Sequence, residues 1–269
     1  MINHQKPLIS VIMGIYNCAD TLSESLDSLL NQTYQNFVVI MCDDGSKDNT
    51  YEVARNYVDR YPEKFILLKN EKNMGLNFTL NKCLENATGE FIARMDGDDI
   101  SLPLRFEKEV SFLDEHPEYA IVSTPMIHFD ENGDFKSCQG NGEPKVSTLA
   151  KGTPFCHAPC MVRKEAYDAV SGYDVDSKKM RVEDWDLWIR MYSKGYKGYN
   201  LQEPMYKMRD DKNAFSRRKF KFRINEARMT IQAVKLLKLS PVNYIYVLRP
   251  ILVGLLPKHI YKALHLLKK

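Results

Sequence analysis

The sequence of 269 residues lacks any segment apolar enough to cross a bilayer, which takes about 20 residues. The longest apolar run near its carboxyl end, residues 244–256, is interrupted by Arg249 and Pro250. Residues 1–7 lack a basic start that leads into an apolar stretch, so we expect no signal peptide. These absences predict a cytoplasmic protein without a membrane-spanning segment.

Paired metal-binding cysteines are also missing. None of the six cysteines stands in a CxxC pair, and we expect free thiols in a reducing compartment. The segment Cys156-His157-Ala158-Pro159-Cys160 suggests zinc, but the sequence offers no second pair of ligands to close such a site. Structural zinc is therefore disfavoured.

Acidic residues are absent from residue 227 onward. Residues 227–269 carry eight Lys or Arg, so the net charge of +3 divides into +8 here and −5 over the preceding part. A further basic cluster lies at 217–223, and apolar residues alternate with Lys and His over 241–269. This composition is typical of a helix at an anionic membrane surface. Packing onto the body of the protein, a dimer contact and nucleic-acid binding are the alternatives, and the many Leu, Ile and Val residues disfavour nucleic acid.

What the chain does contain is a regular alternation of strand and helix patterns. Hydrophobic residues make up 44% and charged residues 27%, which is ordinary for a globular protein and argues against disorder. Apolar, β-branched runs predict strands, and apolar residues at helical spacing follow each of the first three. The predicted strands are residues 8–13, 37–42, 65–68, 91–95 and 119–123. The expected fold class is α/β, with a mostly parallel sheet flanked by helices.

The ends of these helices can be predicted as well. Asp20 or Thr21 is placed to cap the first helix, and Gly89 to end the third. Pro103 suits the first turn of the helix after the fourth strand. A further helix is expected over 183–194, and the part from about residue 206 is mostly helical and basic.

Two acidic turns directly follow predicted strands. Asp43-Asp44-Gly45-Ser46 follows the second strand, and Asp96-Gly97-Asp98-Asp99 follows the fourth. In parallel sheets ligands bind beyond the carboxyl ends of the strands, so both turns should stand on one edge. Each also has a plain explanation as a solvated turn. A calcium loop starting at Asp96 is disfavoured, because Ser101 stands where the loop requires glycine.

Five motifs in order resemble family 2 glycosyltransferases. They are Ser10-Val11-Ile12-Met13 with Tyr16-Asn17, Asp43-Asp44-Gly45-Ser46 with Asp48 and Thr50, Asn73-Met74-Gly75, Asp96-Gly97-Asp98-Asp99 and Glu183-Asp184. The resemblance covers roughly residues 7–205. It implies a GT-A (Rossmann-like) domain over 1–205, with a nucleotide-binding half at about 1–123 and an acceptor half at 124–205. A helical basic extension would then occupy 206–269.

The resemblance also implies roles for individual residues. Asp44 would contact the base of a nucleotide, with Asp43 and Tyr16 beside it. Asp96 would bind the ribose or share with Asp98 a divalent metal, Mg²⁺ or Mn²⁺, which prefers oxygen ligands. His157 matches a histidine near the diphosphate, where it would be a metal ligand or a phosphate donor, and a structural histidine is the alternative.

Glu183 and Asp184 open the predicted helix over 183–194, where acidic residues are often only dipole partners or caps. By resemblance Asp184 matches the general base that draws a proton from the acceptor hydroxyl, while Glu183 orients it or the acceptor. Trp185 is a candidate for stacking on an acceptor sugar, and we expect Trp188 to lie in the core.

The resemblance therefore implies an inverting glycosyltransferase of the hexosyltransferase type, with a nucleotide-diphosphate donor (a UDP-sugar) and a saccharide or lipid-linked saccharide acceptor. Its expected place is the inner face of the plasma membrane, in surface-polysaccharide synthesis, and an oligomer is compatible with the sequence. A polyprenyl-phosphate glycosyltransferase and a catalytically silent nucleotide-sugar-binding subunit are the alternatives. A nucleotidyltransferase is disfavoured, because no glycine-rich loop bearing Lys or Arg follows the first strand.

Overall fold

The computed structural model describes residues 8–137, 140–210 and 220–255. Cys138, the basic residues at 217–219 and the tail from 256 onward lie outside these described residues. Two compact units interleave along the chain: unit 1 comprises Met1–Pro144, Phe155–Tyr173 and Lys194–Asp210, and unit 2 comprises Lys145–Pro154, Asp174–Ser193 and Asp211–Lys269. The predicted domain boundary at residue 205 stays a prediction. No helix in the described ranges has the length and apolar character needed to span a membrane.

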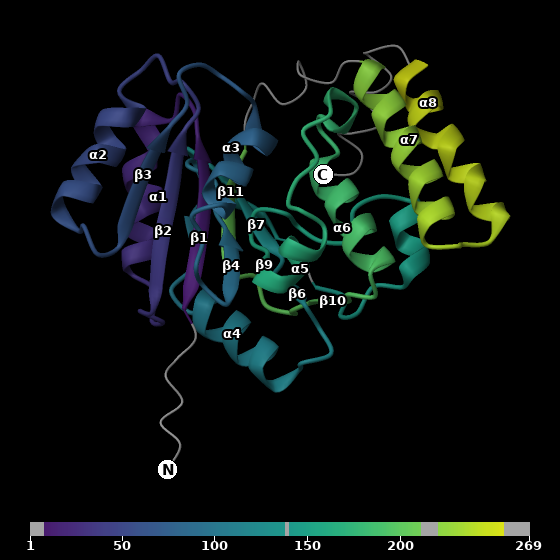
Figure 1. The fold of residues 1–269 in the computed structure, drawn as a ribbon, viewed down its shortest axis with the longest axis horizontal. Helices are drawn as coiled ribbons and strands as arrows, with labels where there is room; N and C mark the ends of the chain where they lie inside the picture. Colours follow the sequence, from purple (N-terminus) through teal and green to yellow (C-terminus); the bar gives the residue numbers. More distant parts are fainter. Residues whose placement is uncertain (1–7, 138–139, 211–219, 256–269) are drawn as a thin grey trace. The chain divides into compact units, whose positions relative to one another are not determined.

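Unit 1 is built on a seven-stranded sheet in the order β10-β6-β9-β4-β1-β2-β3 (Figure 1). Only β9 runs antiparallel to its neighbours, so the prediction of a mostly parallel sheet is confirmed. The strands are β1 (Ile9–Ile15), β2 (Phe37–Asp43), β3 (Phe65–Lys69), β4 (Phe91–Arg94), β6 (Ile121–Ser123), β9 (Met161–Arg163) and β10 (Gly198–Asn200).

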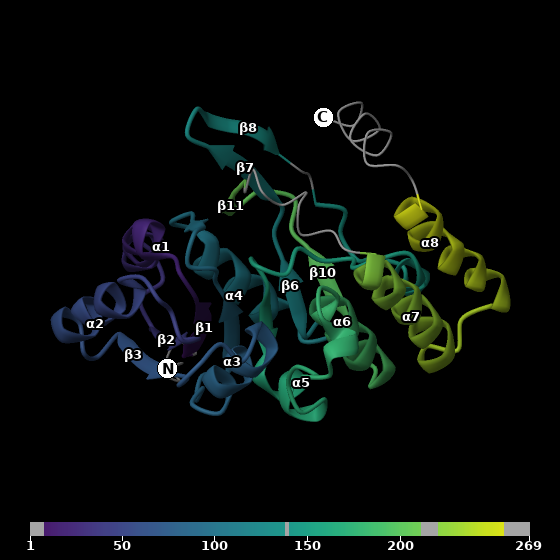
Figure 2. The ribbon, with the colours of Figure 1, turned by 90° about the horizontal axis from the view of Figure 1, so that it is seen from above.

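Helices cover both faces of this sheet. Figure 2 shows α1, α2 and α4 on one side and α3 and α5 on the other. The residues of β1 alternate accordingly: Val11 and Met13 pack with Leu26 of α1 and Phe106 of α4 in the main core cluster. These helices are α1 (Ala19–Leu30), α2 (Thr50–Arg60), α3 (Leu76–Leu84), α4 (Arg105–Glu115) and α5 (Lys164–Ala169).

A second, four-stranded sheet in unit 1 has the order β5-β11-β7-β8. Its strands are β5 (Ile100–Ser101), β7 (Met126–Asp130), β8 (Gly133–Ser137) and β11 (Tyr206–Arg209). Strand β5 follows the acidic turn after β4 and pairs with β11, Ser101 opposite Tyr206. This pairing brings the carboxyl end of β11 next to the acidic turn.

Unit 2 is helical. It contains the 3₁₀ helices η1 (Val146–Ala150), η2 (Ser177–Lys179) and η3 (Pro241–Val247) and the α-helices α6 (Glu183–Ser193), α7 (Phe220–Leu236) and α8 (Leu248–Leu255). Helix α7 contacts α6, η1, η3 and α8. The expectation of a mostly helical segment after residue 206 is thus confirmed for residues 220–255, whereas Tyr206–Arg209 forms a strand.

Several helix ends differ from the sequence predictions. Helix α1 begins at Ala19 after Cys18, so neither Asp20 nor Thr21 is its cap. The Thr21 hydroxyl instead donates to the main-chain oxygen of Gly97, 2.9 Å away. Helix α3 ends at Leu84, well before Gly89, and Pro103 precedes rather than opens α4. Long-range contacts to the acidic turn therefore outweigh the local capping pattern at Thr21.

Candidate active site

The two acidic turns lie at the same edge of the main sheet. Ile15, the last residue of β1, pairs with Asp43, the last of β2, and β1 pairs in parallel with β4 as well. The turns after β1, β2 and β4 therefore follow the carboxyl ends of three adjacent parallel strands. This confirms the placement expected from the sequence.

The turn after β4 is held by helix α1. The hydroxyls of Thr21 and Ser25 donate to the main-chain oxygens of Gly97 and Asp99, at 2.9 and 2.6 Å. A Cβ atom on Gly97 would lie only 2.8 Å from the sulfur of Cys18, so this close approach requires glycine. The main chain of the turn is thus bonded inward, which leaves the side chains of Asp96 and Asp98 at the surface.

Asp96 is paired with a buried cation. Both terminal nitrogens of Arg94 donate to its two carboxylate oxygens, at 2.9 and 2.6 Å. Arg94 is buried, while the Asp96 side chain keeps about a third of its surface exposed. The guanidinium therefore lies behind the carboxylate, and each oxygen retains a second lone pair for a ligand.

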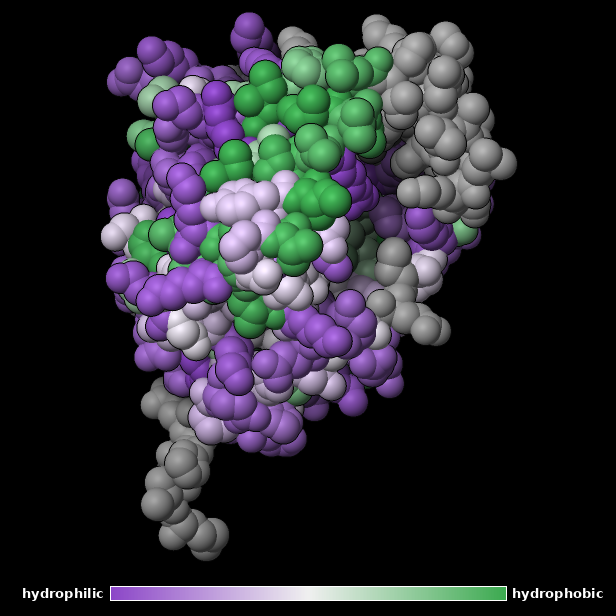
Figure 3. All heavy atoms as spheres, turned by 90° about the vertical axis from the view of Figure 1, so that its right-hand side faces the viewer, coloured by the Kyte–Doolittle hydropathy of each residue, from purple (hydrophilic) through white to green (hydrophobic). Residues whose placement is uncertain are grey.

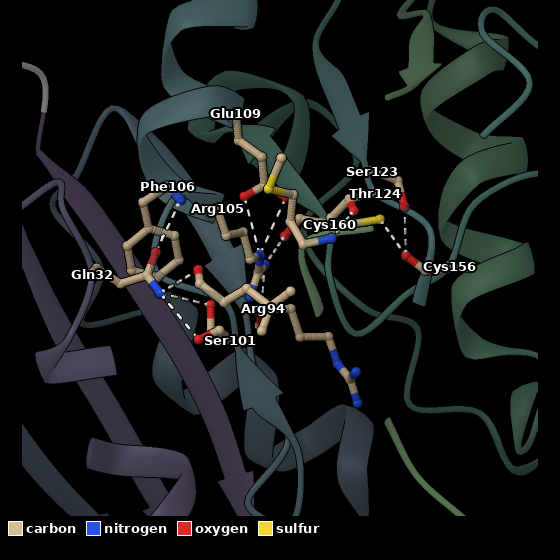
Figure 4. Close-up of polar contacts among 12 residues, drawn as sticks. Gln32, Arg94, Ser101, Arg105, Phe106, Glu109, Ser123, Thr124, Cys156 and Cys160 are labelled. Carbon is tan, nitrogen blue, oxygen red and sulfur yellow. Dashed lines mark hydrogen bonds and ion pairs between the residues drawn. The ribbon is translucent and has the colours of Figure 1, made fainter. Parts of the chain in front are cut away.

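Buried polar side chains hold the main chain at Arg94 and the turn that follows it. Arg105 and Glu109 form a fully buried ion pair, and Arg105 donates to the main-chain oxygen of Arg94 at 3.0 Å (Figure 4). Gln32 bonds Ser101 on the far side of the same turn. Burial raises the pKa of Glu109 to about 7, against the opposing effect of Arg105.

Asp98 and Asp99 differ in environment although they are adjacent. Asp98 is exposed, yet partial desolvation and then the Asp96 charge raise the pKa of its carboxyl. Asp99 is buried, and burial followed by the charges of Asp96 and Asp98 raises its pKa to about 8. The backbone N–H of Arg209 donates to Asp99 at 2.8 Å, and the Arg209 side chain donates to the Asp98 main-chain oxygen at 2.9 Å. Asp99 therefore fixes the turn, and Asp98 presents its carboxylate to solvent.

The acidic turn could supply one or two ligands to a divalent cation, and the substrate would supply other ligands. Within 8–137, 140–210 and 220–255, no group of three or more His, Cys, Asp or Glu side chains could enclose a metal ion. Magnesium and manganese commonly take only one or two protein carboxylates, with phosphate and water oxygens as the other ligands. Asp98 is the better donor of the two exposed carboxylates, because Asp96 is already neutralised by Arg94.

The turn after β2 is also more tightly bonded than its sequence suggests. Asp44 is buried and accepts hydrogen bonds from the Asn70 side chain and from the backbone N–H groups of Met74 and Gly75, at 2.7–2.9 Å. Asp43 accepts from the backbone N–H of Ser46 at 3.3 Å. Asp44 thereby fixes the segment that contains Asn73-Met74-Gly75, and its role as base contact stays a prediction.

Tyr16 lies at the end of the neighbouring strand β1, with 43% of its surface exposed. The next residue, Asn17, has a left-handed φ of 49°, and its side chain accepts from the backbone N–H of Lys47 at 2.9 Å. The turns after β1 and β2 are therefore bonded to one another, and an aromatic ring is exposed beside them.

His157 is linked to two buried tyrosines. Its Nε2 lies 2.8 Å from the hydroxyl of Tyr173, which is 3.1 Å from that of Tyr167. Burial and then the Arg94 charge hold the pKa of His157 well below its usual value, so the ring is neutral. Its engagement with Tyr173 favours the structural alternative over metal ligation through Nε2.

Glu183 and Asp184 are the first two residues of α6 in unit 2, and both are partly exposed. Asp186, two residues after Asp184, is fully buried and forms ion pairs with Lys179 and Arg190, with a hydrogen bond from Gln232 of α7 at 2.7 Å. The amino end of α6 is thereby fixed within its unit. The convergence of Asp184 with Asp98 stays a prediction.

The expectations for the two tryptophans have different outcomes. Trp188 is fully buried, as expected. Trp185 is buried too, and its indole N–H donates to the main-chain oxygen of Leu149 at 2.7 Å. The stacking role proposed for Trp185 is therefore disfavoured, because the ring is buried and its N–H is already bonded.

Sequence reasoning missed Arg94, Arg209 and the structural role of Asp99. Arg94 could have been found, because residues two apart at a strand end face the same side and Asp96 follows it at that spacing. Arg209 carried no such signal, since it reaches the acidic turn only through the pairing of β11 with β5.

Comparison with known proteins agrees with this geometry. A sequence profile described as "Glycosyl transferase family 2" matches residues 10–171. "Putative glycosyltransferase EpsE" of Bacillus subtilis (strain 168) is 44% identical over 96% of this chain and 93% of its own. The "UDP-Glc:alpha-D-GlcNAc-diphosphoundecaprenol beta-1,3-glucosyltransferase WfaP" of Escherichia coli is 29% identical over 72% of this chain and 73% of its own.

Two solved structures share the fold. The crystal structure of S. aureus TarS 1-349 in complex with UDP superposes with a TM-score of 0.68 at 19% identity, covering 89% of this chain and 69% of that one. The mannosyltransferase PcManGT from Pyrobaculum calidifontis, in complex with GDP-Man and Mn2+, gives a TM-score of 0.62 at 20% identity over 95% and 72% of the two chains. The acidic sheet edge, the fold and the sequence match together show that the chain is a glycosyltransferase of family 2 with the GT-A fold.

Proposed function

We propose that the protein transfers a sugar, with inversion and with the help of Mg²⁺ or Mn²⁺, from a nucleotide-diphosphate donor to a hydroxyl of a saccharide or lipid-linked saccharide. The observation that carries this proposal is the unequal state of the two exposed carboxylates after β4. Arg94 neutralises Asp96 with two hydrogen bonds, whereas Asp98 is exposed beside that pair.

This difference assigns separate roles to Asp96 and Asp98, for which the sequence alone allowed Asp96 to bind either the ribose or the metal. A carboxylate that is already paired with a guanidinium attracts a cation less, but it still accepts hydrogen bonds from neutral hydroxyls. Asp96 therefore suits the ribose, and Asp98 suits the metal. The metal, when bound, neutralises charge on the departing nucleotide diphosphate.

The other residues of the sheet edge would hold the nucleotide. Tyr16 offers an exposed ring, and Asp44 with Asp43 lies beside it at the ends of β1 and β2. Asp44 has donors on both oxygens, so we expect it to act mainly by shaping the segment at residues 73–75 against the base. His157 is neutral and bonded to Tyr173, so it would support this part of the sheet structurally rather than supply charge to the diphosphate.

Asp184 would accept the proton of the acceptor hydroxyl as that oxygen attacks the sugar. A carboxylate in this role contributes roughly 10²–10⁴-fold in rate. Glu183 stands next to it at the start of α6 and would orient the acceptor. Holding both substrates at reacting distance supplies much of the remaining rate enhancement.

The relatives supply the finer expectations. UDP occupies one similar structure, and GDP-Man with Mn2+ another, which supports a nucleotide-sugar donor and a divalent metal. The name of WfaP describes transfer from UDP-Glc to a lipid-linked GlcNAc, and that of "Amylovoran biosynthesis glycosyltransferase AmsE" of Erwinia amylovora a role in a polysaccharide. We therefore propose a UDP-sugar donor, a lipid-linked acceptor, surface-polysaccharide synthesis and a place on the inner face of the plasma membrane.

The test is to measure UDP binding by calorimetry with and without Mn²⁺ for the wild type, Asp98→Asn and Asp96→Asn. We expect Asp98→Asn to lose the metal-dependent part of the affinity and keep the metal-independent part. Asp96→Asn should weaken both parts while retaining the response to metal. Equal metal dependence in Asp98→Asn would contradict the assignment. A panel of nucleotide sugars, screened for metal-dependent hydrolysis, then identifies the donor.

A further inference from the structure

Unit 2 exposes a stripe of large apolar side chains at its carboxyl-terminal end. Val242, Ile245, Leu248, Leu252 and Leu255 are 71, 61, 57, 60 and 67% exposed. They recur every three or four residues through η3 and α8, so they line one face of consecutive helical turns. We call these five residues the apolar stripe.

The other face of α8 packs against α7. Pro250 is buried, and a Cβ atom on Gly254 would lie 2.7 Å from the ring of Phe220. Helix α8 therefore approaches α7 closely on one side and leaves its apolar stripe on the surface. Figure 3, which faces the side where α8 lies in Figure 1, shows hydrophobic side chains gathered over this part of unit 2.

The segment that carries the stripe has charges of one sign. Residues 227–255 contain Arg228, Lys235, Lys238 and Arg249 and no Asp or Glu. The last three of these cations are exposed, like the stripe. Two copies of this surface would bring like charges together, which disfavours a dimer contact, whereas an anionic surface would be attracted.

We propose that the apolar stripe binds the surface of an anionic lipid bilayer. Its side chains would enter the boundary between headgroups and acyl chains, and Lys235, Lys238 and Arg249 would meet lipid phosphates. This inference deepens the proposed function, because it supplies a physical route to a lipid-linked acceptor. Only the link to a lipid-linked acceptor rests on the proposed function, because lipid binding itself is measured without turnover.

The experiment measures co-sedimentation of the full chain with vesicles of phosphatidylcholine, alone or mixed with phosphatidylglycerol. We expect binding to the mixed vesicles that weakens as salt rises. The double variant Leu248→Glu/Leu252→Glu should lower the vesicle partition coefficient at least about tenfold, because it places charges where apolar side chains would insert. Val175→Glu, at a position as exposed as Leu252 but outside the stripe, should bind like the wild type.

A second variant separates charge from insertion. Lys235→Gln/Lys238→Gln keeps the stripe and should lose most of the preference for phosphatidylglycerol and part of the salt dependence. Circular dichroism and UDP binding check that each variant is folded, and unchanged UDP binding with lost vesicle binding separates this inference from the proposed function. Three results would overturn it: no vesicle binding by the wild type at low salt, wild-type binding by Leu248→Glu/Leu252→Glu, or a wild-type dimer that the same variant dissociates.

Discussion

The two acidic clusters look alike in sequence but differ in how their charge is balanced. Each consists of four residues with three carboxylates, and in each one carboxylate is buried, Asp99 in the first and Asp186 in the second. Asp186 is enclosed by Lys179 and Arg190, which overcome burial and lower its pKa. Asp99 receives only a backbone N–H and a tyrosine hydroxyl, and burial and its acidic neighbours raise its pKa to about 8.

This difference bears on where the proposed metal ion would bind. In the cluster of α6 the protein supplies its own positive charges, because Lys179 and Arg190 pair with Asp186, and the proposed role of Asp184 as a base needs no further cation there. In the cluster after β4, Asp96 is the one carboxylate with an ion pair among the described residues, and burial and the Asp96 charge keep the pKa of Asp98 raised although Arg209 and Arg94 oppose them. A metal ion bound at Asp98 would relieve the repulsion between Asp96 and Asp98, which is why we propose Asp98 as its ligand.

The largest expected effect is on transfer in Asp184→Asn. Loss of the base should lower the transfer rate roughly 10²–10⁴-fold while UDP and metal binding stay unchanged. Initial rates and calorimetry on the same preparation give both quantities. Full activity in this variant would favour the polyprenyl-phosphate alternative, because a phosphate acceptor needs no base. Binding of UDP without hydrolysis or transfer by the wild type would instead favour the silent subunit.

The next largest effect is on stability in Asp186→Asn. Removing one carboxylate leaves the partly buried cations Lys179 and Arg190 against a neutral group, which should cost roughly 3 kcal/mol of unfolding free energy. Asp184→Asn, two residues away and partly exposed, is the matched control and should change stability by less than about 0.5 kcal/mol. Denaturant titration of both variants measures the contrast, and similar losses in the two would contradict the proposed division of labour within α6.

A smaller effect is expected in Arg94→Lys, which keeps a positive charge but loses the planar, two-bond geometry toward Asp96. We expect the affinity for UDP to fall roughly tenfold, or about 1.4 kcal/mol, with its metal dependence preserved. Calorimetry at constant Mn²⁺ measures the loss. Arg163→Lys, at an arginine that bonds the main chain of Leu113 and Tyr119, serves as a control for the substitution itself.

How much of this was predictable depends on the distance over which each contact is made. Strands β1 to β4 and the sheet edge with Asp43 and Asp96 followed from apolar runs and from the rule for parallel strands. The Arg209 contact did not, because it joins residues 110 positions apart and depends on the pairing of two short strands. The burial of Trp185 was equally unpredictable, because the main-chain oxygen that accepts its indole N–H belongs to Leu149 in η1, 36 residues earlier.

The smallest effect concerns Asp99 and is a matter of pH. Because the folded-state pKa of Asp99 is raised to about 8, its contribution to stability is fully present below its unfolded pKa and is lost as the pH rises through about 8. Asp99→Asn removes this titration. The unfolding free energy of the variant should be within about 1 kcal/mol of the wild-type value near pH 5, and it should rise relative to the wild-type value as the pH rises. Denaturant titrations across the range measure the difference between the two proteins at each pH. Added Mn²⁺ should narrow the difference, because a cation at Asp98 offsets the charge that raises the pKa of Asp99. A difference that is constant with pH would show that Asp99 is as well neutralised as Asp186, and the contrast between the two clusters would then be lost.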